Sequence, residues 1–395
     1  MKRCLILPVL AVATTLLLHS AACSQNAWQV GTDPGSHFVT VQEAIESPLV
    51  KPRDALFISA PRPSGPVTTS KPLTLLGLRG GGFGLHCALT VRDIPRGEKF
   101  EIIGGNAASL FGRDEYIHFE NCEGQILLSA CGNIPMLPDP PSILLRNCPR
   151  VSINQSSLHE VAIINSVVSI ARTHFDLIAT SHGVPPLLLQ DSKVTMAACT
   201  ATTLPSSIGL RSPPTIAMTR GRLHIAGYGN PISTGGGVSQ ANYAIFSNGG
   251  EVVIDPDVRL NASGAHPPLG GSSRFTFEQM PFVRVLHRGP GQLVFPIAMG
   301  SPGDTVSMFL GISAERPLTV PGLGELWMEP TLVWHLGTRT FGPVAEECFA
   351  ALIPPTVPIG TAMTFQLLTV TPGGVATISM PSEVPVSPDL SGWWK

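Results

Sequence analysis

A short polar stretch, "RDEYIHFEN", carries side chains that could act on a sugar. Side chains alternate between the two faces of a β-strand, so Ile117 and Phe119 are expected to point inward. The same alternation places four polar side chains on one outer face: Asp114, Tyr116, His118 and Glu120. Two acids, a phenol and an imidazole there could bind a sugar or carry general acid–base catalysis. The polar face of an ordinary strand has the same composition, so both interpretations stay open.

Two tryptophans further along are candidates for stacking on a sugar ring. Trp327 and Trp334 are seven residues apart, which places them on opposite faces if one unbroken strand holds both. One is then expected in the core, and the other becomes the candidate sugar-stacking residue. Four histidines occur singly and are expected at the surface or in loops rather than as ligands: His86, His159, His174 and His182.

Metal, cofactor and nucleic-acid chemistry are not indicated. The sequence has no Cys-x-x-Cys pair and no cysteine–histidine cluster with the spacing of a zinc site, so we expect no metal and no other cofactor. Only 13% of the 395 residues are charged and the net charge is −2, which excludes the basic surface of a nucleic-acid-binding protein. The 40 glycines and 38 prolines, beside a hydrophobic fraction of 43%, indicate many short strands joined by turns.

The first residues form a targeting segment. Lys2 and Arg3 precede an apolar run, Leu5 to Leu18, which predicts a signal peptide over residues 1–22 and an exported protein, either secreted or held in the cell envelope (periplasm or cell surface). That run is shorter than the roughly 20 residues that span a bilayer, and no later segment qualifies, so no transmembrane segment is expected. "HSAACS" resembles a bacterial lipoprotein cleavage box, although Ser20 replaces the usual leucine. A lipid anchor at Cys23 and ordinary cleavage just before it both stay open.

One short helix is expected in a chain whose other segments indicate strands. Thr40 followed three residues later by Glu43 is a capping box, in which each side chain satisfies a backbone donor at the helix start. Three apolar residues share one helix face, and Pro48 is expected to end the helix. Two strand segments follow, "DALFISA" and "KPLTLLG".

These segments, "TVQEAI", "DALFISA" and "KPLTLLG", resemble the opening of right-handed parallel β-helix proteins of the pectin-lyase-like class, which includes the pectin methylesterases. The resemblance spans Thr40 to Gly77. It implies that the helix covers the first coil, because an open stack would expose apolar core and unpaired strand groups. A helix that leads into an ordinary sandwich is the alternative.

The next segments repeat a strand, a polar or glycine corner, and a second strand. One residue per unit is the predicted corner: Asn121, Asn147, Asn165, Asp191, Arg220 and Asn248, with separations of 26, 18, 26, 29 and 28 residues. These separations suit β-helix coils that carry loops of variable length on one side.

Stacked coils lie about 4.8 Å apart, so equivalent positions form rows along the axis. Cys122 and Cys148 each follow a corner asparagine, and this spacing lies within the Cα range that a disulfide tolerates. A Cys122–Cys148 disulfide is one candidate, and two stacked free thiols are the other. Glu120 and Arg146 share a register and could form an ion pair.

Turn-forming residues from Asp255 to Ser273 indicate a domain boundary. We assign residues 23–265 to the β-helix, 266–278 to a linker, 279–385 to a β-sandwich and 386–395 to a C-terminal tail. "GSPGDTVSMFLGIS" and "GTAMTFQLLTV" resemble a C-terminal β-module found on many bacterial extracellular proteins, which implies a surface or secreted context. The expected fold class is all-β: a right-handed parallel β-helix with an N-terminal capping helix, followed by a small antiparallel β-sandwich.

The catalytic motifs of the carbohydrate-active β-helix enzymes are absent from the sequence. The methylesterase pattern of two aspartates, a glutamine and an arginine–tryptophan stretch has no match, and "SHGV" at Ser181 matches only a His-Gly pair of the polygalacturonase pattern. The catalytic residues are therefore unknown. We expect a non-catalytic bacterial cell-envelope or extracellular protein with a polysaccharide-binding surface. A divergent polysaccharide lyase or glycoside hydrolase is the first alternative, and a structural or adhesive surface protein is the second.

Overall fold

The computed structural model of the chain is nearly all β, with 59% of residues in strands and 2% in helices. It describes residues 26–59, 61–77, 85, 87–104, 116–132, 142–177, 184–203, 213–227, 231–234, 243–262, 267–287, 293–353, 357 and 361–386. Two compact units divide the chain, Ala27–Met280 and Pro281–Lys395 with Met1–Asn26. The first unit is a parallel β-helix of about seven turns and the second contains antiparallel sheets, which confirms the predicted fold class.

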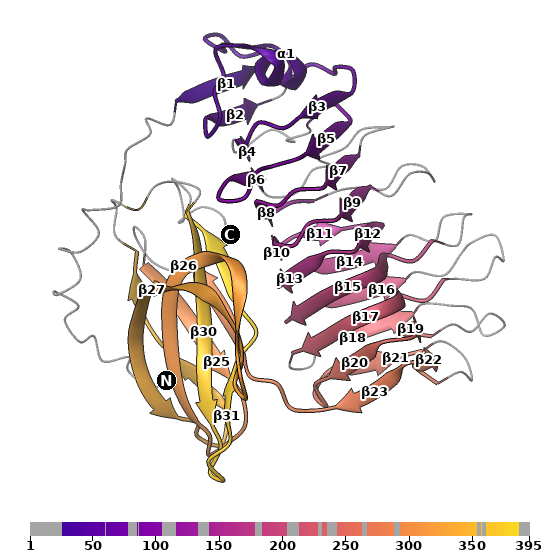
Figure 1. Ribbon diagram of the computed structural model, residues 1–395, viewed down its shortest axis with the longest axis vertical. Helices are drawn as coiled ribbons and strands as arrows, with labels where there is room; N and C mark the ends of the chain where they lie inside the picture. The colour runs from indigo at the N-terminus through magenta and orange to yellow at the C-terminus, as the bar shows by residue number, and fades with distance from the viewer. Residues whose placement is uncertain are drawn as a thin grey trace. The chain divides into compact units, whose positions relative to one another are not determined.

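Three rows of stacked parallel strands run along the β-helix (Figure 1). The first face contains β3 (Val67–Thr69), β5 (Leu89–Arg92), β7 (Ile117–Glu120), β9 (Ile143–Arg146), β12 (Val161–Ile164), the first halves of β15 (Leu187–Ala197) and β17 (Ile216–Ala226), β19 (Ile245–Asn248) and β22 (Leu269–Gly271).

The second face contains β1 (Ala27–Gly31), β2 (Ala55–Ser59), β4 (Thr74–Gly77), β6 (Lys99–Ile103), β8 (Gln125–Ser129), β10 (Val151–Asn154), β13 (Val167–Ala171), the second halves of β15 and β17, β20 (Glu251–Ile254) and β23 (Arg274–Phe277). The third face contains β11 (Ser157–Leu158), β14 (His174–Leu177), β16 (Thr200–Thr203), β18 (Pro231–Thr234) and β21 (Arg259–Asn261).

In-register pairing places like side chains above one another in the interior. Leu89 pairs with Ile117, and Ile117 with Ile143, so each coil continues the column of the coil before it. All three side chains are buried in one continuous hydrophobic core that runs through the β-helix. Parallel strands that are covered on the interior side this way gain most of their stability from burial of branched aliphatic side chains.

Helix α1 (Val41–Glu46) contributes its apolar face to the same core and lies at the N-terminal end of the β-helix (Figure 1). The Thr40 hydroxyl accepts a hydrogen bond from the Glu43 amide at 3.0 Å, which confirms the predicted cap. The Glu43 carboxylate accepts from the Val39 amide at 3.0 Å. Beyond the helix end, Lys71 Nζ donates to the carbonyl oxygens of Ile45, Ser47 and Val50 at 2.7, 2.9 and 3.1 Å. These contacts satisfy carbonyls that the helix leaves without partners.

The first corner, between the first and second faces, has left-handed backbone conformation in successive coils. The residues and their φ angles are Asp93 (57°), Asn121 (54°), Asn147 (54°), Asn165 (46°), Asp191 (50°) and Arg220 (59°), and all except Asp93 were predicted as corners. The prediction of Asn248 is wrong by one residue, because Asn248 pairs with Thr219 in the strand and Gly249, with φ of 85°, occupies the corner. Glycine adopts this conformation without the steric cost that a Cβ imposes.

Side-chain bonds connect the corner residues of neighbouring coils. Asn147 Nδ2 donates to Asn121 Oδ1 at 2.7 Å, and Asn165 Nδ2 donates to Asn147 Oδ1 at 2.9 Å. Asp191 accepts two hydrogen bonds from the Arg220 guanidinium at 2.6 and 2.7 Å. Short polar side chains thus both tolerate the corner conformation and connect one coil to the next.

The second unit packs two antiparallel sheets around its own core. One sheet contains β24 (Phe282–His287), β25 (Leu293–Met299), β28 (Glu346–Cys348) and β29 (Ala351–Leu352). The other contains β26 (Thr305–Val320), β27 (Gly324–Thr340), β30 (Ala362–Val370), β31 (Ala376–Ile378) and β32 (Ser382–Pro385). In the described ranges, no helix has the length and apolar character needed to cross a membrane.

The corner residue Asn147 offers a direct test of this architecture. Asn147→Ala removes the two side-chain hydrogen bonds of Asn147 and keeps a Cβ on a left-handed backbone. We therefore expect the free energy of unfolding to fall by about 2 kcal/mol. Asn147→Gly also loses the two side-chain hydrogen bonds, but glycine adopts the left-handed backbone without steric cost, so this variant should be less destabilising. The control Asn248→Ala lies outside the corner and should change little. Urea unfolding followed by circular dichroism measures all three, and equal losses at Asn147 and Asn248 would contradict the assigned corner role.

Candidate functional site

The structure places part of the predicted polar patch together. Tyr116 and His118 are half-buried on the outer side of the first face, and their rings stack with centroids 4.2 Å apart at 27°. Asp114 lies outside the described residues. Glu120 sits at the opposite end of β7, where the Arg146 guanidinium contacts its carboxylate at 3.4 Å, as predicted for this pair. The described patch is therefore an aromatic pair, separate from an exposed ion pair at the first corner.

One coil has an unusually short third corner, the connection from the third face to the first. Only His159 and Glu160 separate β11 from β12, whereas residues 178–186 separate β14 from β15 and residues 204–215 separate β16 from β17. Both side chains are buried, Glu160 being 4% and His159 6% exposed. The backbone of Glu160 is left-handed, with φ of 49°. A glutamate in this conformation costs about 1–2 kcal/mol, as do other non-glycine turn residues of the coils such as Arg172 and Ala198.

The register brings Glu160 into line with the aromatic pair. The Ile117 amide donates to the Ser142 carbonyl and the Ile143 amide donates to the Glu160 carbonyl, so Tyr116, Ser142 and Glu160 are equivalent positions in three successive coils. At about 4.8 Å per coil, the Cα atoms of Tyr116 and Glu160 lie roughly 10 Å apart. A short stretch of the third corner therefore carries a phenol, a hydroxyl and a carboxylate.

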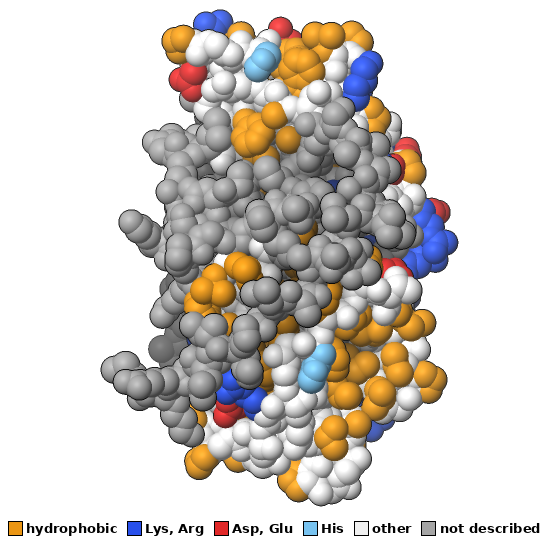
Figure 2. Space-filling model, turned by 90° about the vertical axis from the view of Figure 1, so that its left-hand side faces the viewer, with side chains coloured by type: hydrophobic (Ala, Val, Ile, Leu, Met, Phe, Trp, Pro, Cys, Tyr) orange, Lys and Arg blue, Asp and Glu red, His pale blue; other side chains and the backbone are white. Residues whose placement is uncertain are grey.

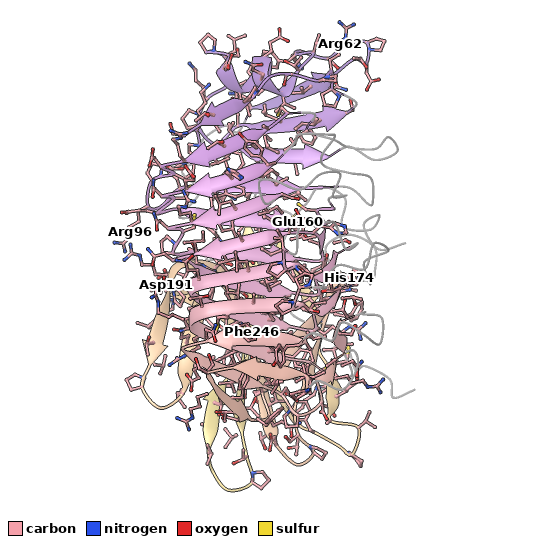
Figure 3. The ribbon with its side chains drawn as sticks, turned by 90° about the vertical axis from the view of Figure 1, so that its right-hand side faces the viewer. Arg62, Arg96, Glu160, His174, Asp191 and Phe246 are labelled. Atoms are coloured by element: carbon pink, nitrogen blue, oxygen red, sulfur yellow. The ribbon has the colours of Figure 1, made fainter. Side chains whose placement is uncertain are left out.

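The outer side of the third face carries further polar side chains, the first of which follow the second corner. His174 Nδ1 hydrogen-bonds Thr200 Oγ1 at 2.5 Å, and Thr202 Oγ1 lies 3.4 Å from Ser233 Oγ. Figure 3 shows Glu160 and His174 at the same edge of the β-helix. We call the following set of half-buried side chains the corner surface: Tyr116, His118, His174, Thr200, Thr202 and Ser233.

The chemistry of the corner surface suits hydrogen bonding to hydroxyl groups. Its hydroxyls and imidazoles can both donate and accept, and the Tyr116–His118 stack offers a flat apolar face. These described side chains include no carboxylate, and the neighbouring Glu160 side chain is buried. Glycosidases generally need two carboxyl groups, about 5–5.5 or 6.5–9.5 Å apart. The described arrangement therefore favours binding over glycosidic cleavage.

The third face and Glu160 were not predicted as a site. His159 and His174 were expected singly at the surface or in loops. His159 lies in the third-corner connection, where it is buried, and His174 begins β14 directly after the second corner. A signal was present in the sequence, since the corner separation of 18 residues between Asn147 and Asn165 is much shorter than the others. That short separation marks the coil whose third corner is only His159 and Glu160.

The two tryptophans of the second unit differ from the simple alternation expected of them. Trp327 is buried, and its amide donates to Gln366 Oε1 at 2.8 Å. Trp334 is half-buried and also packs against the core of the second unit. Both lie on β27, whose pairing with β26 shifts register between Gly311 and Leu318, so the faces do not alternate evenly between them. Sugar stacking stays a prediction for Trp334.

The remaining predicted positions are placed as follows. Cys122 and Cys148 are free buried thiols in the structure, so their disulfide stays a prediction. Cys23, the candidate lipidation site, lies outside the described residues. Among the described side chains, no group of three or more histidine, cysteine or acidic residues could hold a metal ion. Comparisons of the chain with protein-family models and with curated proteins gave no match.

The surface of the second unit carries several exposed hydrophobic side chains. The most exposed are Leu318, Val344, Leu352 and Val375. Hydrophobic side chains also gather on the lower part of the face seen in Figure 2. Single exposed hydrophobic residues are common on soluble proteins, so they define no site by themselves.

A second carboxylate, Glu101 on β6, is fully buried and belongs to a local ion pair. Its oxygens contact Lys99 Nζ at 3.1 Å and accept a hydrogen bond from Thr74 Oγ1 at 2.7 Å. Burial raises the pKa of Glu101, and this effect outweighs the opposite effects of Lys99 and Thr74. A fully buried carboxylate cannot contact a polymer, so we assign Glu101 a structural role.

The raised pKa of Glu101 predicts a pH dependence of stability. The folded chain binds this proton more tightly than the unfolded chain, so stability should fall as pH rises from the unfolded glutamate pKa through the folded one. Glu101→Gln keeps the hydrogen-bonding shape without titrating, and should flatten that part of the profile. Thermal midpoints of both proteins between acid and neutral pH measure the effect. Identical profiles would show that Glu101 has the same pKa in the folded and the unfolded chain, which would contradict the prediction.

Proposed function

We propose that this protein is an exported bacterial cell-envelope or extracellular protein that binds an extended polysaccharide along the corner surface without cleaving it. The observation that carries the proposal is the set of half-buried hydroxyl and imidazole side chains on the third face, together with the stacked Tyr116 and His118 on the first face. A polymer lying along the axis would meet hydrogen-bonding groups at each coil, about every 4.8 Å. The leader-like segment over residues 1–22 supports export.

We also propose that the β-helix belongs to the pectin-lyase-like class and is right-handed. The resemblance of the opening segments supports this, as do the capping helix and the stacked parallel coils that follow it. Right-handed crossover between parallel strands is also the general rule. Fold likeness alone fixes no function, so the corner surface and not the class supports the proposed activity.

A binding experiment tests the proposal on the full secreted chain. A glycan array followed by affinity electrophoresis in neutral and acidic polysaccharides should identify at least one retained polymer. Tyr116→Ala combined with His174→Ala removes the ring face and one imidazole, and should weaken that binding at least tenfold, equal to about 1.4 kcal/mol. The control Asp191→Asn, at the exposed first corner, should bind as tightly as the parent chain. Retention that is equal in all three proteins would place binding elsewhere.

Catalysis is the alternative that must be measured separately. The same polysaccharides are incubated with the protein and assayed for new reducing ends and for unsaturated products. We expect no turnover, because the described corner surface carries no exposed carboxylate. Turnover that disappears in Glu160→Gln would overturn the non-catalytic proposal and make Glu160 the catalytic acid or base of a divergent lyase or hydrolase.

A further inference from the structure

A row of thiols and hydroxyls lines the inside of the first corner. Each side chain directly follows a corner residue and donates to the carbonyl two residues earlier. The distances are 3.5 Å for Cys122, 3.3 Å for Cys148, 2.8 Å for Ser166 and 2.7 Å for Ser192. The row satisfies carbonyl groups that the sharp corner would otherwise leave without partners.

Cys122 and Cys148 are neighbours within this row. Glu120 pairs with Arg146 in the parallel register of β7 and β9, so the two cysteines occupy equivalent positions one coil apart. Strand neighbours in register lie about 4.8 Å apart, inside the Cα range of 4.4–6.8 Å that a disulfide tolerates. Both side chains are 0% exposed, and the interaction between the two thiols lowers the pKa of Cys122 and raises that of Cys148.

The matching row at the second corner separates its cysteines. That corner lies between the second and third faces, and its row runs Cys131, Ser156, Thr173, Cys199. Two hydroxyl side chains therefore stand between the thiols. Burial raises the pKa of each thiol to about 12, so both stay protonated. The second row holds the same carbonyl contacts with no adjacent pair of thiols.

We propose that Cys122 and Cys148 are a disulfide site that joins two successive coils once the protein has reached an oxidising compartment. The two S–H bonds are broken and one S–S bond forms, while a disulfide oxidant takes up two electrons and two protons and becomes two thiols. Because both sulfur atoms are fully buried after folding, the reaction takes place before the corner closes. The inference rests on the export part of the proposed function and not on polysaccharide binding.

Refolding the full reduced chain with a mixture of oxidised and reduced glutathione tests the site without relying on export. The product is unfolded without reductant, alkylated with iodoacetamide, digested and analysed by mass. We expect one disulfide-linked peptide pair containing Cys122 and Cys148, with Cys131 and Cys199 alkylated. Alkylation of Cys122 and Cys148 in the folded, oxidised product would overturn the proposal. Loss of polysaccharide binding would leave this result unaffected.

Serine variants give matched controls, because Ser166 and Ser192 show that serine fits this row. The oxidised parent should melt roughly 5–10 °C above the same chain refolded with reductant. Cys122→Ser with Cys148→Ser should fold and lose that difference. Cys131→Ser, placed beside Ser156 in the second row, should keep the difference in melting temperature between the oxidised and the reduced chain. A difference that persists in the double variant would assign the effect to other cysteines. If the double variant does not fold, the mass analysis of the parent decides alone.

Discussion

In-register hydrogen bonding between successive coils is the constraint on which the β-helix depends. Because each strand pairs with the same strand of the next coil, a residue that points inward in one coil has an inward partner in the next, as in the column of Leu89, Ile117 and Ile143. The same rule forces every first corner to turn at an equivalent residue. A corner with a different geometry would shift the register and move the following side chains to the wrong face.

The corners therefore require residues that accept a left-handed backbone, and they also require partners for the carbonyls next to the turn. Asn121, Asn147 and Asn165 meet the first need and bond to one another along the axis. Buried thiols and hydroxyls meet the second need from inside. This double requirement explains why a small residue with a thiol or hydroxyl directly follows the polar corner residue in these coils. It also explains why cysteines are buried without being clustered as a metal site.

The sequence predicts the features that depend on local chemistry and misses those that depend on register. Thr40 and Glu43 identify the helix start because capping acts within four residues. "SNGG" could turn at Asn248 or Gly249, since both residues tolerate positive φ, and only the pairing with Thr219 decides. The third face was missed because its strands are as short as Ser157–Leu158 and rich in threonine and serine. The alternation expected for Trp334 fails because a neighbouring strand shifts its pairing.

Register also determines where such a fold can vary. Chain length varies most at the third corner, which holds two residues before β12 and residues 235–244 before β19, and it varies less at the first corner, from residues 93–98 between β5 and β6 to 165–166 between β12 and β13. Glycine could adopt the φ of 49° at Glu160 without steric cost, yet a glutamate stands there. The same left-handed backbone recurs at the second-corner residues Ala130, Gln155, Arg172 and Ala198, so the conformation of Glu160 is that of a turn in the coil. Its side chain is buried at the short connection between β11 and β12, where it belongs to the packing of that turn.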